Sequence, residues 1–473
     1  MKKAFSKKNL WEAMPSVLKK IAGLSLSFIP LEYLIGRKFR DTTKIIISAD
    51  KWTKAEVDAY HFEQLKEQVN NAYNKCPAYK KLYDTADLDI SVFNELSDFK
   101  KFPLIDKAFI NDNIDDLLLV DKNNSDVDYV TTGGTSGVPL SFYINAGRSQ
   151  IEYAYLVDGW RKAGFKLGNV KAVLRGRVTE TRGTVHQSYD PIFNEYYYSN
   201  FHMSNVDMKN YISHIKTLKN CFLHVYPSSI YQLARFAKKE NISFDNIQAI
   251  LAESENVYPE QRTFVESVFN CRYFSSYGHS EKLIAAGECE YSSDYHVWPT
   301  YGYLELLDTD GCVITKKGQV GEIVGTGFIN TVMPFIRYRT GDFAEYVGHY
   351  CDKCKRNHLI IKDIRGHNIQ EHLVAIDNSL IPWSAINMHD DTFDDVLQYQ
   401  FYQETPGVAV IKIKTGESFT DENKQRIISN ISRKLQHRVE ISVAQVDDIP
   451  LTVRGKSVFV DQRINISNES IIL

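Results

Sequence analysis

Residues 129–143 have the sequence YVTTGGTSGVPLSFY, and the organisation of the whole chain can be built outward from them. Apolar, β-branched and aromatic residues at both ends predict two extended segments with a loop between them. Glycines let successive backbone N–H groups turn towards one point, and hydroxyl side chains add donors there. The candidate donors are Thr131, Thr132, Gly133, Gly134, Thr135, Ser136 and Gly137. The segment predicts a polyphosphate-binding loop; a Gly/Thr hairpin without a ligand is the alternative.

Two common nucleotide-binding motifs do not describe this loop. A Walker loop closes with Gly-Lys-Ser/Thr at the start of a long helix, and no such sequence comes directly after residue 137. The dinucleotide pattern Gly-x-Gly-x-x-Gly is also absent from the loop. Any phosphate binding here must therefore belong to another class of enzyme.

The composition is that of an ordinary globular protein. A chain of 473 residues can bury a large core and should divide into at least two domains. Lys and Arg total 56 against 59 Asp and Glu, so no strong field favours nucleic acid as a partner. Seven cysteines spread over a long chain argue against a disulfide framework and predict a reducing, cytoplasmic compartment.

The longest apolar run, residues 21–35, contains Pro30 and Glu32 and is too short to span a bilayer comfortably. We expect no transmembrane segment and interpret the run as a packing helix. A signal peptide is the rival interpretation, because Lys2 and Lys3 precede the run, but Glu12 intervenes. Peripheral membrane association stays open as an alternative.

Alternating strands and helices predict an α/β fold after the loop. Helical spacing is also clear earlier, at residues 51–83, where Thr53 is a plausible N-cap and Pro77 a break. The predicted elements that follow are a helix at 149–163, a strand at 170–175, a strand, turn and helix start at 224–234, a strand at 249–252, a helix at 261–268 and a strand at 271–274. In a largely parallel sheet of this kind, ligands collect at the carboxyl ends of the strands.

The sequence SSYGHSE at 275–281 lies just beyond such a strand. A turn at Gly278 would let Tyr277, Ser280 and Glu281 converge. These side chains supply a flat face for a base, a hydroxyl for a phosphate and a carboxylate for a metal. A packed tyrosine with a solvated glutamate is the alternative.

A further polar motif, FIRYRTGD, occupies residues 335–342. Strand alternation predicts Arg337 and Arg339 on one side and Ile336 and Tyr338 on the other. A pair of solvated arginines on a surface strand is the alternative. Asp342, at the end of the motif, can accept two hydrogen bonds from a ligand.

The chain changes character after residue 362. Strands at 397–402, 408–414 and 439–446, with a helix at 420–435 capped by Thr420, predict a small α+β domain. We expect a large domain at 1–362 and a small domain at 363–473. The sequence PLTVRGKS at 450–457 places Lys456 near the C-terminus, and an exposed lysine in a basic turn is its alternative interpretation.

Four residues in the region 289–354 have metal-ligand spacing. Cys351 and Cys354 form a Cys-x-x-Cys pair, and Cys289 and His296 lie upstream. Together they would complete a closed tetrahedral site for structural Zn²⁺. A redox Cys-x-x-Cys is the rival, and His349 and His358 compete with His296 as the fourth ligand.

In this order, the motifs resemble those of the adenylate-forming (acyl-CoA ligase) superfamily, whose members carry a Thr/Ser/Gly-rich phosphate loop ending in Gly-x-Pro, a Tyr-Gly-x-Ser/Thr-Glu motif, a Tyr-Arg-Thr-Gly-Asp motif and a C-terminal Gly-Lys. The phenylacetate-CoA ligase family, and within it the capsular polysaccharide biosynthesis CapK-type branch, is the most similar. The segments 30–39, 370–374 and 398–400 suggest that branch.

The resemblance implies a role for each candidate residue. The loop would contact the β- and γ-phosphates of ATP, Ser280 the α-phosphate, Glu281 Mg²⁺, and Asp342 the ribose. The other nucleotide contacts implied are Tyr277 near adenine, Glu253 and Ser254 in the adenine pocket, and Gly278, Arg339 and Arg365. Lys456 would be the catalytic lysine. Arg365 precedes Gly366 and His367 follows it, whereas the family usually has Gly-Arg in this hinge, so the nucleotide-contacting side chain there stays open.

The implied fold is a large adenylate-forming domain with mixed and parallel sheets flanked by helices, plus a small mobile α+β lid. The implied reaction activates a small carboxylic acid with ATP and Mg²⁺ through an acyl-adenylate. The acceptor would be CoA or a sugar-linked amine or hydroxyl, and a homodimer is left open. A non-catalytic nucleotide-binding or scaffold protein of a polysaccharide-assembly system is the alternative.

Overall fold

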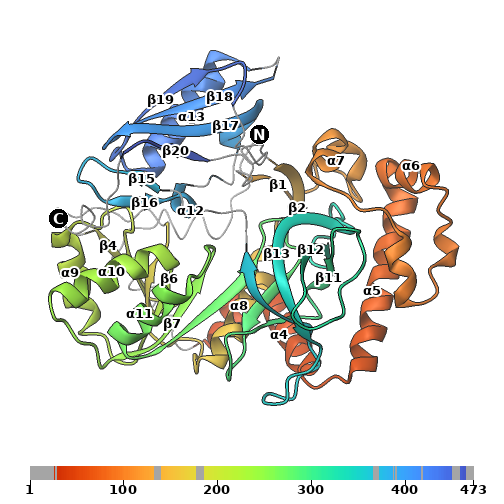
Figure 1. The fold of residues 1–473 in the computed structure, drawn as a ribbon, viewed down its shortest axis with the longest axis horizontal. Coiled ribbons are helices and arrows are strands. Elements are labelled where there is room, and N and C mark those ends of the chain that lie inside the picture. Colours follow the sequence, from red (N-terminus) through yellow and green to blue (C-terminus); the bar gives the residue numbers. More distant parts are fainter. Residues whose placement is uncertain are drawn as a thin grey trace.

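The computed structural model describes residues 26, 29–132, 140–176, 186–365, 372–386, 388, 391–416, 419–449 and 459–464. A twelve-stranded sheet dominates it, with helices on both faces (Figure 1). The predicted α/β class is therefore confirmed. No helix in these ranges is long and apolar enough to cross a membrane.

The chain begins with helices that pack beside the large sheet (Figure 1). They are α3 (Leu31–Ile35), α4 (Arg37–Ala49), α5 (Lys54–Lys75), α6 (Pro77–Thr85) and α7 (Lys107–Asp112), with short 3₁₀ turns η1 (Ile90–Val92), η2 (Leu96–Lys101) and η3 (Ile114–Leu117). Thr53 caps α5 in a reciprocal box with Glu56, and Pro77 is the first residue of α6. Both boundaries confirm the sequence signals, because a capped donor and a missing N–H suit helix starts.

The two extended segments around the predicted loop form an antiparallel pair, β1 (Val127–Thr132) and β2 (Leu140–Asn145). Thr132 pairs with Leu140 at the end nearest the loop. The predicted loop residues Gly133, Gly134, Thr135, Ser136 and Gly137 lie outside the described residues.

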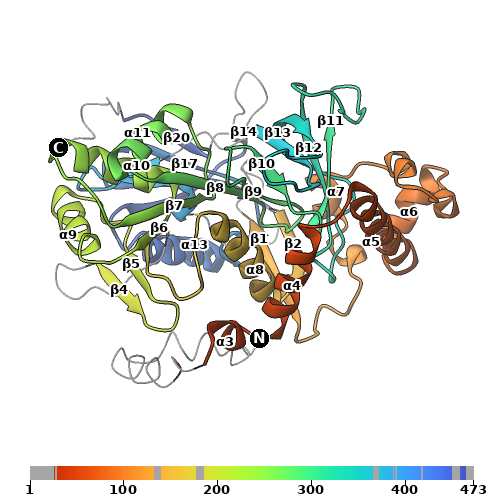
Figure 2. The same cartoon turned by 90° about the horizontal axis from the view of Figure 1, so that it is seen from below.

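Five neighbouring strands of the large sheet run parallel: β5 (Glu195–Tyr198), β3 (Lys171–Leu174), β6 (Cys221–Val225), β7 (Ile247–Glu253) and β8 (Arg272–Gly278). Helices α9 (Asn205–Ile215), α10 (Pro227–Lys239) and α11 (Pro259–Phe269) cover one face, and α8 (Arg148–Lys162) and α4 lie on the other (Figure 2). Alternation in β6 illustrates why: Leu223 joins the core under α9–α11, and its neighbour Phe222 joins the core under α8.

The remaining strands of this sheet are antiparallel to their neighbours. They are β4 (Gln187–Asp190), β9 (Ala285–Glu288), β10 (Tyr295–Val297), β11 (Gly302–Leu307), β12 (Val320–Gly327), β13 (Tyr338–Gly348) and β14 (Ile360–Arg365). The sheet is thus mixed, and the parallel expectation holds for β3 and β5–β8. Hairpin connections in the later part explain the change, since antiparallel neighbours need only short links.

A separate four-stranded sheet follows, in the order β19–β18–β17–β20 (Figure 1). Its elements are β17 (Val396–Thr405), β18 (Val408–Thr415), α13 (Asp421–Lys434), β19 (Glu440–Gln445) and β20 (Val460–Gln462). Before them come β15 (His372–Val374), β16 (Leu380–Pro382), α12 (Trp383–Ile386) and η4 (Asp391–Phe393). The expected three strands and capped helix are present, while β15, β16 and β20 were too short to show a pattern.

The C-terminal sheet packs against the large sheet through a shared hydrophobic core. Phe201 and Tyr226, from the large sheet's end, belong to the same buried cluster as Leu373 and Phe401. The cluster joins both parts of the chain, so the C-terminal part packs on the segments that follow β5 and β6.

Candidate active site

One hydrogen bond joins the motif at residues 275–281 to the motif at residues 335–342. Tyr277 Oη, on β8, donates to Oδ2 of Asp342, on β13, over 2.8 Å. These residues are 65 positions apart and come from strands separated by three others in the sheet. The structure therefore brings together two of the segments on which the resemblance depends.

Glu281 interacts electrostatically with Tyr277 and with the neighbouring Tyr338. Burial and then the charge of Asp342 raise the pKa of Tyr277 well above its ordinary value, with a smaller contribution from Glu281. Burial raises the pKa of Tyr338 as well, followed by the charges of Glu281, Asp106 and Asp342. Both carboxylates therefore lie within electrostatic range of the same two phenols.

Lys107 is a site residue that the sequence analysis missed. It is the first residue of α7. Ile105, two residues earlier, forms a β-bridge with Tyr338, and Arg339 N donates to Ile105 O over 2.9 Å. Burial lowers the pKa of Lys107 to about 8, against the opposing charge of Glu281. Nothing in the local sequence marks this lysine, because tertiary pairing carries it to the neighbourhood of Glu281.

Glu253 and Ser254, at the end of β7, are brought together by Arg175 at the end of β3. Arg175 Nη1 donates to Glu253 Oε1 over 2.7 Å, and Nη2 donates to Ser254 Oγ over 3.0 Å. His224 also hydrogen-bonds to Glu253. Burial opposes ionisation, but Arg175 and His224 lower the pKa of Glu253 to about 2. Arg175, which the sequence showed only as a strand end, thus fixes a carboxylate at the edge where parallel strands end.

The predicted shared face of Arg337 and Arg339 is wrong. Arg337 precedes β13 in a left-handed conformation (φ 52°) and is 4% exposed, paired with Glu305 through Nε and Nη2 at 2.9 Å each. Arg339 is half-exposed and pairs with Glu322. The positive φ breaks strand alternation, so the two guanidinium groups point into different surroundings.

Some of the other predicted site residues belong to the described part of the chain, and some lie outside it. Gly278 ends β8 in register with Ala285, so it is a strand residue and not the predicted turn. Ser280 is half-buried just beyond it. Arg365 ends β14 opposite Phe343, the residue after Asp342, and is exposed. Gly366, His367, Lys456 and the Thr132 side chain are outside the described part.

The four predicted zinc ligands form one cluster. Their ligand atoms, from Cys289, His296, Cys351 and Cys354, all lie within 4.8 Å of one another. Cys354 Sγ lies 3.9 Å from His296 Nδ1. Three thiols and an imidazole gathered from β9–β10 and the β13–β14 hairpin are the donor set that zinc prefers. The rival ligands His349 and His358 are not part of this cluster.

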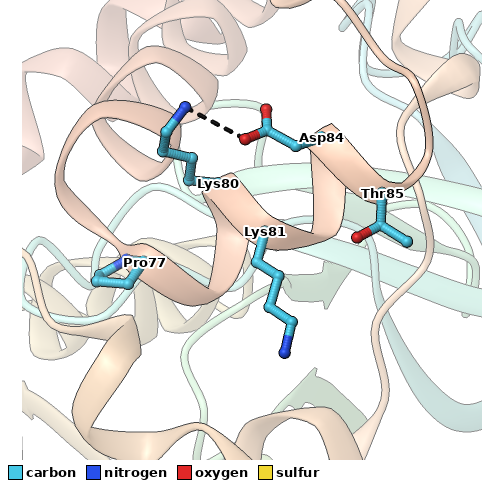
Figure 3. A pocket seen from close by; sticks show the side chains of 5 residues that line it. All are labelled: Pro77, Lys80, Lys81, Asp84 and Thr85. Atoms are coloured by element: carbon cyan, nitrogen blue, oxygen red, sulfur yellow. Dashed lines mark ion pairs between the residues drawn. The ribbon is translucent and has the colours of Figure 1, made fainter.

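A shallow hollow on α6 contains none of the motif residues. Pro77, Lys80, Lys81, Asp84 and Thr85 line it, and Lys80 forms an ion pair with Asp84 at 3.2 Å (Figure 3). These five residues of one helix provide no converging polar groups, so we assign the hollow no role.

Comparisons with known proteins agree with this geometry. Residues 373–463 match the family described as the CapK C-terminal domain. Protein CapK of Staphylococcus aureus is 25% identical over 383 residues, covering 78% of this chain and 81% of the relative. A phenylacetate-coenzyme A ligase of Thermus thermophilus is 23% identical over 405 residues, covering 82% and 87%.

Among solved structures, 2-hydroxyisobutyryl-CoA ligase in complex with 2-HIB-AMP and CoA in the thioesterification state superposes with a TM-score of 0.55. It is 16% identical and covers 87% of this chain and 91% of that one. The fold is that of adenylate-forming CoA ligases, and the chain is similar in sequence to enzymes named as CoA ligases. Its homologues are CapK and the phenylacetate-CoA ligases, which confirms the predicted resemblance.

Proposed function

We propose that this protein joins a small carboxylic acid to the AMP portion of ATP and transfers the activated acyl group to an acceptor. The observation that carries the proposal is the Tyr277–Asp342 hydrogen bond, with Glu281 acting on the same tyrosines. It joins the tyrosine predicted near adenine to the predicted ribose carboxylate across the sheet. Relatives named as phenylacetate-coenzyme A ligases support an acid and CoA as substrates.

Both reactants are anionic, so the site must position them and neutralise charge. The acid's carboxylate attacks the α-phosphorus of ATP, and pyrophosphate leaves. Glu281 would hold Mg²⁺ through its carboxylate, and the ion would supply positive charge to neutralise the phosphates. Lys107, whose charge interacts with that of Glu281, would add a second cation beside the phosphates. Asp342 would hold the ribose through Oδ1, since Tyr277 occupies Oδ2.

We propose that the large and small domains divide between residues 365 and 373, a few residues after the predicted division into 1–362 and 363–473, and that the small domain carries Lys456 into the site. The last strand of the large sheet, β14, ends at Arg365. The match to the CapK C-terminal domain begins at residue 373, which supports a boundary between these positions. A lysine would bridge the substrate carboxylate and the α-phosphate as negative charge develops.

The acceptor is CoA or a sugar-linked amine or hydroxyl, and the predicted resemblance to the CapK-type branch of capsular polysaccharide biosynthesis motivates the sugar-linked acceptor. Relatives named as CoA ligases favour CoA. The competing proposal is a nucleotide-binding scaffold without turnover, motivated by the altered hinge sequence Arg365-Gly366-His367.

An ATP–pyrophosphate exchange assay over a panel of carboxylic acids tests the proposal. We expect acid-dependent exchange with at least one acid class, followed by AMP release when CoA or an amino sugar is added. Folded protein that binds ATP and catalyses no exchange across aromatic, aliphatic and hydroxy acids would favour the scaffold.

We also propose that Cys289, His296, Cys351 and Cys354 hold one structural Zn²⁺. All four positions of a tetrahedron are filled by protein, leaving none for a catalytic water. Arg272 donates to the backbone carbonyls of Cys289 and Ser292 over 2.6 and 2.8 Å, which holds the first ligand loop in place. The site would lock the β13–β14 hairpin against β9 and β10.

A further inference from the structure

Three polar side chains form a row of hydrogen bonds in the candidate site. His279 lies just beyond β8, with Nε2 2.6 Å from Tyr277 Oη, and Tyr277 donates in turn to Asp342. The two rings meet edge to face, 4.8 Å between centroids. The side chains of His279 and Asp342 are 10% and 19% exposed, so water competes little for these bonds.

Counting protons gives the row a direction. A tyrosine hydroxyl has one proton, and a carboxylate can only accept, so that proton goes to Asp342. Burial and the charge of Asp342 raise the pKa of Tyr277 well above its ordinary value, which keeps the hydroxyl protonated. The contact between Tyr277 and His279 can then be a hydrogen bond only if Nε2 carries a proton and donates it.

The other ring nitrogen does not hold His279 in place. Nδ1 is buried and has no hydrogen-bond partner among the residues the structure describes. The bond to Tyr277 is therefore the polar contact that orients this ring. His279 occupies the variable position x of the Tyr-Gly-x-Ser-Glu motif, and the resemblance assigns no role to that position.

We propose that His279 is a positioning residue for the carboxylate that binds the ribose. By donating to Tyr277, it commits the tyrosine proton to Asp342 Oδ2 and so orients Oδ1 towards the ligand hydroxyls. This inference rests on the ribose role proposed above for Asp342.

Calorimetric binding of ATP, 2′-deoxy-ATP and 3′-deoxy-ATP tests it without knowledge of the acid. Wild-type protein should prefer ATP. His279→Leu should reduce that preference roughly 3- to 10-fold, since a hydrogen bond to a charged group is loosened, while affinity for the deoxy nucleotides changes little. His279→Gln should retain the preference, because its amide nitrogen can lie near the position of Nε2. Tyr277→Phe should reduce the preference for ATP as much as His279→Leu does. The double variant His279→Leu/Tyr277→Phe should reduce it no further.

His214→Leu is the matched control. His214 also forms a 2.7 Å hydrogen bond with a tyrosine, Tyr198, but neither residue belongs to the motifs. This variant should leave the preference for ATP unchanged. An unchanged preference in His279→Leu, or an equal loss in Leu and Gln variants, overturns the inference while the ribose role stands. Absence of any preference in wild-type protein overturns both. If His279→Leu does not fold, His279→Asn replaces it, since its shorter amide does not reach Tyr277.

Discussion

Thr131 Oγ1, at the end of β1, lies 3.4 Å from Oδ1 of Asp394, a residue 263 positions later in the C-terminal part of the chain. Tyr129 Oη lies at the same distance from the same oxygen. Burial raises the pKa of Asp394, and neighbouring Asp391 and Asp395 add to the rise. A carboxylate thus lies beside the strand that leads into the predicted phosphate loop.

Replacing Asp394 should therefore strengthen nucleotide binding. Asp394→Asn removes a negative charge near the expected position of the ATP phosphates, and we predict a roughly two- to fivefold lower Kd for ATP by calorimetry. Asp448→Asn, on the exposed surface of the same part of the chain, is the control. Weaker or unchanged ATP binding by Asp394→Asn would contradict a repulsive role.

Nucleotide binding should weaken as the pH rises through the pKa of Lys107, about 8. Burial lowers this value from that of an ordinary lysine, so the ammonium is charged below pH 8 and neutral above it. The charge favours phosphate, and ATP affinity should accordingly fall between about pH 7 and 9 in wild-type protein. Lys107→Met should show weak affinity and no such fall, with Lys101→Met as the exposed control. A parallel pH profile in both proteins would exclude Lys107 as the titrating group.

Lys456→Ala should abolish adenylate formation and spare ATP binding. One point charge acting on the transition state is expected to be worth about 100-fold or more in rate. Exchange kinetics and calorimetry on the same preparation measure the two effects separately. Equal losses in binding and turnover would show that this lysine acts in the ground state.

The cysteine cluster should contain one zinc ion per chain. Mass spectrometry of metal content, followed by chelation, should show its loss together with a fall in Tm of roughly 5 °C or more. Cys351→Ser should behave like the chelated protein. Cys312→Ser, an exposed cysteine outside the cluster, should retain both metal and Tm. Metal-free protein with unchanged Tm would refute a structural site.

The Arg337–Glu305 pair should be a large contributor to folding. Both side chains are 4% exposed, so Glu305→Leu leaves a buried guanidinium without its partner and should cost about 3–5 kcal/mol in urea unfolding. The partly exposed Arg339–Glu322 pair provides the comparison, and Glu322→Ala should cost less than about 1 kcal/mol. Equal losses would mean that burial of the first pair is unimportant.

Local signals in the sequence were sufficient for the fold class and picked out several residues that the structure brings together. Thr53 and Thr420 marked helix starts correctly, because capping depends on residues three positions apart. Cys-x-x-Cys spacing likewise identified two members of the metal cluster, and short-range chemistry predicted Tyr277 and Asp342 as polar site residues.

Only the tertiary structure decided which side chains share a space. Lys107 comes within electrostatic range of Glu281 because Ile105 pairs with Tyr338, and Arg175 meets Glu253 because β3 and β7 flank β6. Arg337 turned into the core because one positive φ overrode strand alternation. Periodicity and motif spacing record interactions along the chain, whereas these contacts depend on strand order and register, which pair residues from distant segments.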